Sequence, residues 1–333
     1  MKTRIDYCRE TLPDVLEEVW NAPELMRLDE VGMHCGCEYT SFDLFKGLKK
    51  YSRREHSYGV MSIVYHFSRD IPSSLAAAFH DIATPCFSHV IDFLHQDFER
   101  QESTEKGTDQ IINNSLFIQK LLKTDQISPN QVIDYHQYPI ADNDSPKLSA
   151  DRLEYSLANM INFGFAHQTE VQSLYDDIQV SKNECGETEL CFQSIDTALR
   201  FGELVLQNSR LYVCKEDRFS MFALSYLIKH AIDDGVVNES DLYLDEPVFL
   251  KKLCSSSKYK RWWTEFKSLS LFEESDKPKP HFYRIPAKHR YIDPFVISRG
   301  RLSKLSDNYA KNLKEFLEDD FSSYLGHPSF FHE

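Results

Sequence analysis

The hydrophobic positions in the first two hundred residues recur mostly with the spacing of α-helices. Between residues 10 and 28 the apolar side chains include Leu12, Val15, Leu16, Val19 and Leu25. Spacings of three and four residues place such side chains on one face of a helix. Pro13 and Pro23 lie near the expected helix starts or breaks. The pattern therefore predicts short helices at the beginning of the chain.

Two later segments, 58–67 and 75–94, are apolar on most faces. Helices without a polar face lie in the interior of a protein, so we expect both segments inside the molecule, with a loop at 68–72 between them. Segment 101–124 carries an apolar stripe on an otherwise polar helix, and segment 150–163 begins another helix. These segments together predict a helical bundle.

The second half of the chain changes character toward its end. Segments 195–206 and 221–232 predict helices, whereas the polar segment 179–190 suits a loop or a short hairpin. Between residues 272 and 294, prolines separate short aromatic runs, which predicts extended chain and a small strand-containing appendage. The expected fold is mainly α.

The composition supports a helical protein and narrows its partners. Of 333 residues only 11 are Gly and 13 are Pro, which disfavours turn-rich sandwiches and glycine-rich dinucleotide loops. With 38 Lys and Arg against 52 Asp and Glu, the net charge is −14. Such a field repels phosphate backbones and anionic lipids, so we expect neither a nucleic-acid polymer nor a membrane as partner. A metal ion or a few pocket cations still allow a small anionic ligand.

The sequence predicts a cytoplasmic protein. Its mean hydropathy is −0.46, and no apolar stretch approaches the ~20 residues that span a bilayer. The opening residues MKTRIDYCRE lack the apolar core of a signal peptide. Eight cysteines are too few in a chain of this length for a disulfide scaffold, so we expect reduced thiols.

Four residues form a candidate metal site: His56, the adjacent pair of His80 and Asp81, and the distant Asp151. Imidazoles and carboxylates from separate helices converge in bundle cores as mixed nitrogen and oxygen sites. His-Asp dipeptides are common, however, and a buried histidine is more often a hydrogen-bonded core residue than a metal ligand. Spacing alone leaves both interpretations open.

Several short sequence motifs around these residues occur together in one known family. They are NAPELMRL at 21–28, RREHSYGV at 53–60, AAAFHDI at 76–82, FSHVID at 87–92 and DRLEY at 151–155. These motifs, and their order along the chain, resemble those of the HD-domain metal-dependent phosphohydrolases, most closely the deoxynucleotide triphosphohydrolase (dGTPase-like) branch. The resemblance implies an HD-domain helical bundle at 1–205 and a C-terminal helical and extended region at 206–333 packed on it.

The resemblance also implies roles for individual residues. It assigns the metal ligands as His56, His80, Asp81 and Asp151, and the ion as Mn, Fe, Co, Ni, Zn or Mg. Independently of the resemblance, we expect Asp81, Asp92 and Glu102 to be catalytic residues, the last two orienting ligands or water together with His89. The alternative for His89 is a helical residue bonded to a neighbour.

The phosphate-binding residues implied by the resemblance are Arg53, Arg152 and Tyr155, with a looser match for Lys215 and Arg218. Arg53 lies three residues before His56, so a helix entrance allows both side chains to point the same way. A guanidinium there offers a bidentate contact to phosphate. For each cation the alternative is an exposed, solvated charge.

The chain departs from the family pattern at four positions. Thr84 and Gln101 stand where the triphosphohydrolases carry histidines that assist proton transfer and the leaving group. Neither residue titrates near neutrality, which removes a general acid or base. Met33 and Asn159 replace the glutamine and aspartate that contact the sugar. We therefore do not expect hydrolysis of a standard deoxynucleoside triphosphate by the usual route.

Two further motifs have plainer interpretations. Cys35 and Cys37 beside His34 suggest zinc, but no second cysteine pair supports it, so we expect free thiols. Cations mixed with aromatic residues at 258–263 are typical of a nucleic-acid contact. With a net charge of −14, a surface helix with its tryptophans packed inward is the better interpretation.

The sequence thus predicts an enzyme, a metal-dependent phosphohydrolase that acts on a nucleotide or another small phosphorylated metabolite through metal-activated water. The alternative, motivated by Thr84 and Gln101, is a metal- or nucleotide-binding regulatory protein whose catalytic step has been lost. A small phosphorylated substrate is the expected partner. Members of the family often assemble, so the resemblance also allows a homo-oligomer.

Overall fold

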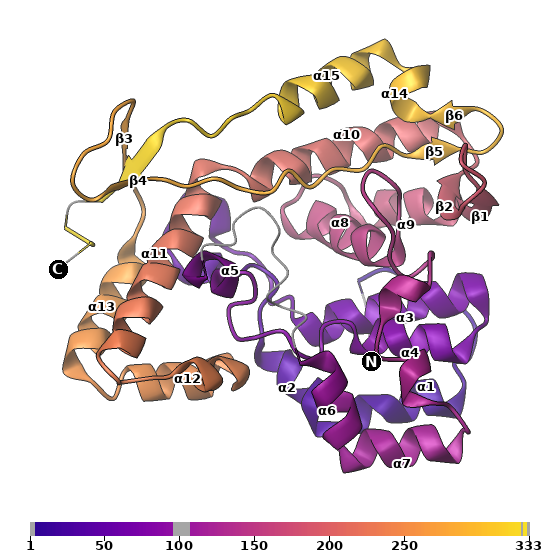
Figure 1. Cartoon of the computed structure of the whole chain (residues 1–333). Helices are drawn as coiled ribbons and strands as arrows, with labels where there is room; N and C mark the ends of the chain where they lie inside the picture. Colours follow the sequence, from indigo (N-terminus) through magenta and orange to yellow (C-terminus); the bar gives the residue numbers. More distant parts are fainter. Residues whose placement is uncertain (1–3, 96–106, 328, 332–333) are drawn as a thin grey trace.

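The computed structural model describes residues 4–95, 107–327 and 329–331, and it is mainly helical, as predicted (Figure 1). The helices of the N-terminal half are α1 (Asp14–Glu18), α2 (Pro23–Arg27), α3 (Arg53–Ser68), α4 (Ile71–Phe79), α5 (Val90–Leu94), α6 (Thr108–Asn114), α7 (Leu116–Thr124), α8 (Ala150–Asn162) and α9 (Gln168–Asp176). Those of the C-terminal half are α10 (Ile195–Tyr212), α11 (Lys215–Asp233), α12 (Glu246–Leu253), α13 (Ser257–Ser268), α14 (Leu302–Leu305) and α15 (Asp307–Leu317). No helix in the described ranges has both the length and the apolar character to cross a bilayer.

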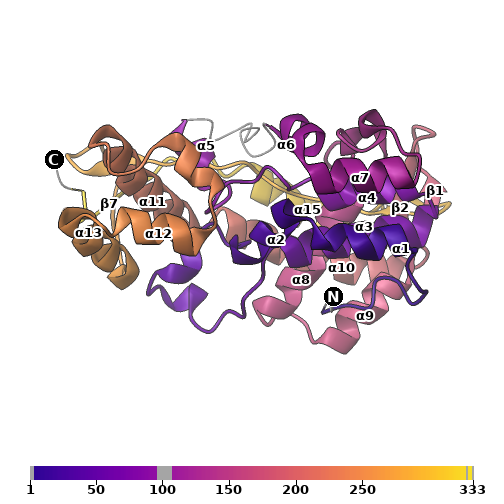
Figure 2. The same ribbon diagram turned by 90° about the horizontal axis from the view of Figure 1, so that it is seen from below.

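The molecule is elongated. Figure 2 shows helices α11, α12 and α13 at one end, and helices α1, α3 and α4 toward the other. Helix α3 packs against both α4 and α8. These three helices form the centre of the N-terminal bundle and bring the predicted metal ligands together.

Polar caps begin the three central helices. Ser52, Asp70 and Ser149 each accept a hydrogen bond from a first-turn backbone amide of α3, α4 and α8 respectively. Such caps satisfy amides that have no partner within the helix. The loop predicted at 68–72 is shorter than expected, because Arg69 ends α3 in the left-handed conformation and α4 already begins at Ile71.

The apolar segment 75–94 lies inside the molecule, as predicted, but it contains two helices separated by a turn at 80–89. In this turn Phe87 and Ser88 adopt φ angles of 59° and 51°, which residues with a Cβ rarely adopt. Pro85 also opposes a continuous helix. The turn begins with His80 and Asp81, so its shape decides where these side chains point.

The apolar interior consists of two clusters, and each combines both halves of the chain. The larger joins α1, α3, α4, α7 and α8 to α10, α14 and α15. The smaller joins α5 and the segment around residues 35–45 to α11, α12 and α13. Both clusters and helix α10 cross the predicted boundary between residues 205 and 206. The division into 1–205 and 206–333 stays a prediction.

Two small sheets connect segments that are distant in the sequence. Strands β1 (Ile178–Lys182) and β2 (Thr188–Phe192) form an antiparallel hairpin. Strand β2 also pairs in parallel with β5 (Phe295–Val296), which pairs antiparallel with β6 (Gly300–Arg301). In the second sheet β7 (Tyr324–Gly326) lies between β3 (Glu273–Ser275) and β4 (Phe282–Arg284). The predicted hairpin and strand-containing appendage are both present.

Candidate metal centre

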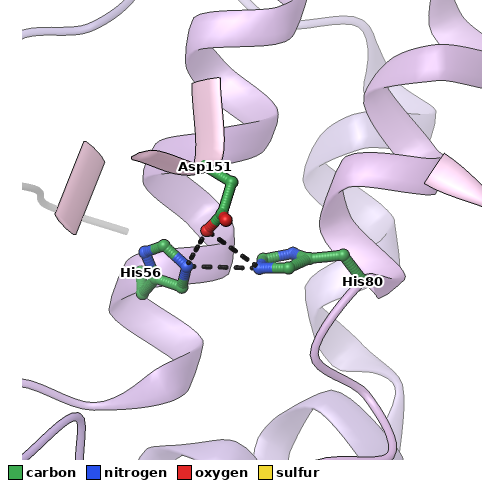
Figure 3. A group of neighbouring side chains, drawn as sticks. All are labelled: His56, His80 and Asp151. Carbon is green, nitrogen blue, oxygen red and sulfur yellow. Dashed lines mark hydrogen bonds and ion pairs between the residues drawn. The ribbon is translucent and has the colours of Figure 1, made fainter. Parts of the chain in front are cut away.

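Two histidines and an aspartate from separate parts of the bundle point toward one another (Figure 3). His56 lies in the first turn of α3, His80 directly follows α4, and Asp151 lies in the first turn of α8. The Nε2 atom of His56 is 3.0 Å from Oδ1 of Asp151 and 3.2 Å from Nε2 of His80. Within the described part of the chain, these three residues form a cluster whose ligand atoms are close enough to share one metal ion.

Hydrogen bonds on the far side of each imidazole ring turn its Nε2 atom toward the cluster. Nδ1 of His56 donates to Oε2 of Glu154 over 2.6 Å, and Nδ1 of His80 donates to the carbonyl of Ala77 over 2.7 Å. Metal-binding histidines usually donate their second ring N–H in this way, which fixes the tautomer. In its neutral form each ring therefore presents an Nε2 lone pair, and with the Asp151 carboxylate this donor set fits a divalent ion.

The electrostatic environment of His56 favours positive charge. Burial lowers its pKa, but Asp151 and Glu154 together raise the pKa of His56 to about 10. Metal ligation requires the neutral form of the ring. A proton and a metal ion therefore compete for Nε2.

Asp81, the fourth predicted ligand, lies beside this cluster and is held by two other residues. Its Oδ2 atom is 3.4 Å from Nε2 of His80 and 3.8 Å from Nε2 of His56. The same oxygen accepts a hydrogen bond from Arg53 over 2.9 Å, and Oδ1 accepts one from Thr84 over 2.8 Å. Burial raises the pKa of Asp81, but Arg53 and the histidines outweigh this and hold it well below its usual range. The carboxylate is thus ionised, and its role as a ligand stays a prediction.

Two of the predicted phosphate-binding residues lie next to the cluster. The Arg53 side chain is buried and contacts Asp81 through Nη1 and the Ser88 hydroxyl through Nε. Tyr155 lies one helical turn after Asp151 on α8, with its ring centroid 6.4 Å from that of His56. Burial raises the pKa of Tyr155 to about 12, so its hydroxyl stays protonated at neutral pH.

Arg152 is committed to the loop that precedes α8. Its Nε atom donates to the carbonyl of Lys147 over 2.9 Å, and Nη2 donates to Asn143. Nη1 pairs with Asp142 at 3.2 Å. These contacts give Arg152 a structural role in shaping the start of α8.

Lys215 and Arg218 are not brought to the metal cluster. Lys215 forms an ion pair with Glu274 at 2.6 Å, and Arg218 donates to the carbonyl of Ile285. Both line a pocket of about 660 Å³ between the start of α11 and the end of α15. None of the four predicted metal ligands lines this pocket.

The two remaining predicted catalytic residues have different outcomes. Asp92 is fully buried in α5 and accepts a hydrogen bond from Nδ1 of His89 over 2.9 Å. Burial lowers the pKa of His89 despite this bond, and the positive charge of Arg290 acts in the same direction. Glu102 lies outside the described residues, as does Gln101.

Sequence reasoning missed the carboxylate that orients His56. Glu154 is 2% exposed and also accepts hydrogen bonds from the hydroxyls of Tyr7 and Tyr51. It occurs three residues after Asp151 in the motif DRLEY. An acidic residue at that position was the available signal, because it lies on the same side of α8 as Asp151.

The inward packing of the tryptophans is confirmed, whereas the preference for thiols over zinc stays a prediction. All eight cysteines are free, and Cys37 donates a weak hydrogen bond to Asp217. Trp262 and Trp263 in α13 are 3% and 6% exposed, so both pack inward.

Comparisons with known proteins find two distant relatives by sequence. No protein-family model matches the chain. The uncharacterized protein YdhJ of Bacillus subtilis is 26% identical over 178 residues, which cover 53% of this chain and about half (52%) of YdhJ. The metal-dependent phosphohydrolase cns2 of Cordyceps militaris is 24% identical over 306 residues, covering 86% of this chain and 81% of cns2.

The fold also occurs in a solved structure. The crystal structure of a hypothetical protein from Aquifex aeolicus matches this chain with a TM-score of 0.61 and 16% sequence identity. The match covers 90% of this chain and 89% of the other. At this identity the likeness establishes a shared fold and nothing about activity.

Proposed function

We propose that the protein is a metal-dependent phosphohydrolase of the HD type that acts on a small phosphorylated molecule, with a nucleotide as the preferred substrate class. The convergence of His56, His80 and Asp151, with Asp81 beside them, carries this proposal. The similarity to cns2, named a metal-dependent phosphohydrolase, supports it over most of the chain.

In this proposal His56, His80, Asp81 and Asp151 hold one divalent ion. When bound, such an ion supplies Lewis acidity, which polarises a phosphoryl oxygen and acidifies water at neutral pH. Arg53 keeps Asp81 ionised and in place through the contact at 2.9 Å. Its guanidinium also adds positive charge where negative charge develops on the phosphoryl group.

The chain itself offers a pair of residues for proton transfer. The buried Asp92 orients His89 through Nδ1, which leaves Nε2 as the reactive nitrogen. The turn at 80–89, which contains Thr84, has two histidines: His80 is a proposed metal ligand, and His89 is the other. Thr84 donates its hydroxyl to Asp81, so it positions a ligand and does not exchange a proton.

The second candidate function is a metal- or nucleotide-binding regulator without turnover. The observation that favours it is Thr84, which replaces a titrating side chain and occupies Oδ1 of Asp81. Ligand binding raises the free energy of unfolding of such a protein as the ligand concentration rises, but the protein releases no phosphate from any ester.

The test combines metal content with phosphate release. Asp81→Ala should abolish metal binding and hydrolysis of nucleotides and phosphomonoesters, and the partly exposed Asp151→Asn should do the same with less risk to folding. Asp144→Ala is the control, since its side chain is 99% exposed. The measurements are elemental analysis, calorimetric titration with Mn²⁺ and phosphate release. Unchanged turnover in Asp81→Ala contradicts the proposal, whereas metal binding without release from any ester favours the regulator.

A further inference from the structure

A long extended segment crosses the molecule between β4 and β5 (Figure 1). We call residues 285–294 the strap. The sequence contributes two prolines to it, Pro286 and Pro294, and proline cannot donate to a sheet or continue a helix. The strap therefore spans the distance between the two small sheets without regular secondary structure of its own.

The first end of the strap is anchored in the smaller apolar cluster. Ile285 is fully buried there, directly after β4. Its carbonyl accepts a hydrogen bond from Arg218, which is itself only 3% exposed. A buried cation bound to a backbone carbonyl is costly to release. Arg218 thus holds the strap, a role that its position in the sequence did not reveal.

The second end is fixed by several hydrogen bonds around Ile292 and Asp293. The carbonyl of Ile292 accepts from the Tyr309 hydroxyl over 2.5 Å, and the amide of Asp293 donates to the carbonyl of Pro146 over 3.0 Å. The Asp293 carboxylate accepts from the amide and hydroxyl of Ser303. Both ends of the strap are therefore fixed to the helical body.

Between these anchors the strap places Arg290 beside the proposed active site. Its Nη2 atom lies 3.4 Å from Nε2 of His89, the nitrogen proposed to exchange a proton. The charge of Arg290 also acts on Tyr155 and Tyr212, where it opposes the rise of both pKa values that burial causes. Arg290 thus contacts the turn that carries His89, and its charge reaches Tyr155 on α8.

We propose that Arg290, delivered by the strap, binds the phosphate group of the substrate. This inference rests on the proposed function and names a residue that recognises its substrate class. A guanidinium offers two parallel N–H donors that match two phosphate oxygens. Nη2 of Arg290 lies beside an imidazole nitrogen of His89, and a phosphate oxygen accepts a stronger, charge-assisted bond from a guanidinium than a neutral nitrogen does.

Two other cations near the site have contacts that shape the protein itself. Arg53 is buried and pairs with Asp81, and Arg152 is held by the loop before α8. A phosphate reaching Arg53 competes with a carboxylate that the metal site needs. Because the strap is anchored at both ends, Arg290 approaches from a fixed backbone, which lowers the entropy cost of binding the anion.

The test compares Arg290→Ala, Arg290→Lys and the control Arg299→Ala. Arg299 is an exposed cation in the turn between β5 and β6. The probes are inorganic phosphate, titrated calorimetrically in the presence of Mn²⁺, and a phosphomonoester for steady-state kinetics. Arg290→Ala should weaken phosphate binding and raise KM by roughly 10- to 100-fold, as expected for one charge-assisted contact. Arg290→Lys should recover part of this loss, and Mn²⁺ affinity should stay unchanged in all three variants.

The outcomes separate this inference from the proposed function. Wild-type phosphate affinity and KM in Arg290→Ala overturn the inference and leave the phosphohydrolase proposal intact. Weaker phosphate binding in Arg290→Ala, with no hydrolysis by the wild type, supports the inference and contradicts an enzyme. A wild-type protein that binds Mn²⁺ but no phosphate overturns the inference, and a loss of Mn²⁺ affinity in Arg290→Ala overturns it as well.

Discussion

Glu154 shows how one buried carboxylate determines the chemistry of a histidine. It accepts hydrogen bonds from His56 over 2.6 Å, from Tyr7 over 3.2 Å and from Tyr51. Burying a charge is costly unless its oxygens are well satisfied, and these three donors provide that. Because the carboxylate only accepts, Nδ1 of His56 must carry the proton, and Nε2 is left for a metal ion.

Glu154→Gln tests this role at the level of the tautomer. The glutamine amide can donate to Nδ1, which moves the ring proton to Nε2 and blocks the metal-binding atom. We expect about 10- to 100-fold weaker Mn²⁺ binding, the usual effect of losing such an outer partner, measured by calorimetry. Glu18→Gln on the exposed face of α1 is the control. Wild-type Mn²⁺ affinity in a folded Glu154→Gln protein contradicts this account.

The sequence predicted individual metal ligands better than the long-range hydrogen bonds around them. His56, His80 and Asp151 were predicted from motif words, and the structure brings them together. The partners of Glu154 could not be predicted in this way, because Tyr7 is separated from it by 147 residues. Likewise, the sequence could not show that Arg218 contacts the carbonyl of Ile285, 67 residues away, and not a phosphate.

At the scale of helices, α3 and α8 approach closely at one glycine. A Cβ atom on Gly59 would lie 2.5 Å from Cγ of Glu154 and 2.8 Å from its Cδ. Glu154 cannot move aside freely, since its carboxylate is bonded on three sides. The glycine therefore allows α8 to bring its carboxylate within reach of His56.

Gly59→Ala should force these helices apart. We expect a loss of about 1–3 kcal/mol in the free energy of unfolding, typical of an overpacked core, together with weaker Mn²⁺ binding. Urea denaturation and calorimetry measure the two effects. Ser57→Ala on the same helix is the matched control, because its buried hydroxyl has no hydrogen-bond partner among the described residues and its removal should not destabilise the fold. Equal stability of Gly59→Ala and the wild type would show that α8 adapts.

Helices were easier to predict than the turn that joins two of them. The apolar patterns located α3, α4 and α8, because periodicity is a local property. The turn at 80–89 depends on positive φ angles at Phe87 and Ser88. Ser88 is held there by long-range contacts, donating to the carbonyl of Gly32 and accepting from Arg53. Local sequence carries little signal for such a conformation.

At the scale of the whole molecule, a buried ion pair joins the two halves of the chain. Arg301 in β6 pairs with Glu189 in β2 at 2.7 Å, and their side chains are 7% and 0% exposed. Arg301 also donates to the carbonyl of Asp293 at the end of the strap. This cation therefore holds together the hairpin, the second strand pair and the strap.

Arg301→Ala leaves Glu189 buried without its main partner. We expect a loss of about 3–5 kcal/mol in the free energy of unfolding, measured by urea denaturation, and faster amide exchange in the strap. The control is Lys314→Ala, whose exposed pair with Glu318 at 3.6 Å contributes about 0–1 kcal/mol. If both variants lose the same small amount, the ion pair does not hold the strap.

The parallel pairing of Phe192 in β2 with Val296 in β5 also has a consequence for the order in which a ribosome makes the parts of the site. All four proposed metal ligands lie before residue 152, whereas Arg290 and the pairs that hold it emerge much later. Non-local strand pairing of this kind forms slowly and only after both strands exist. A growing chain therefore contains all four proposed metal ligands while it still lacks the arginine proposed to bind phosphate. Under the proposed function, substrate binding would then wait until β5 has paired with β2.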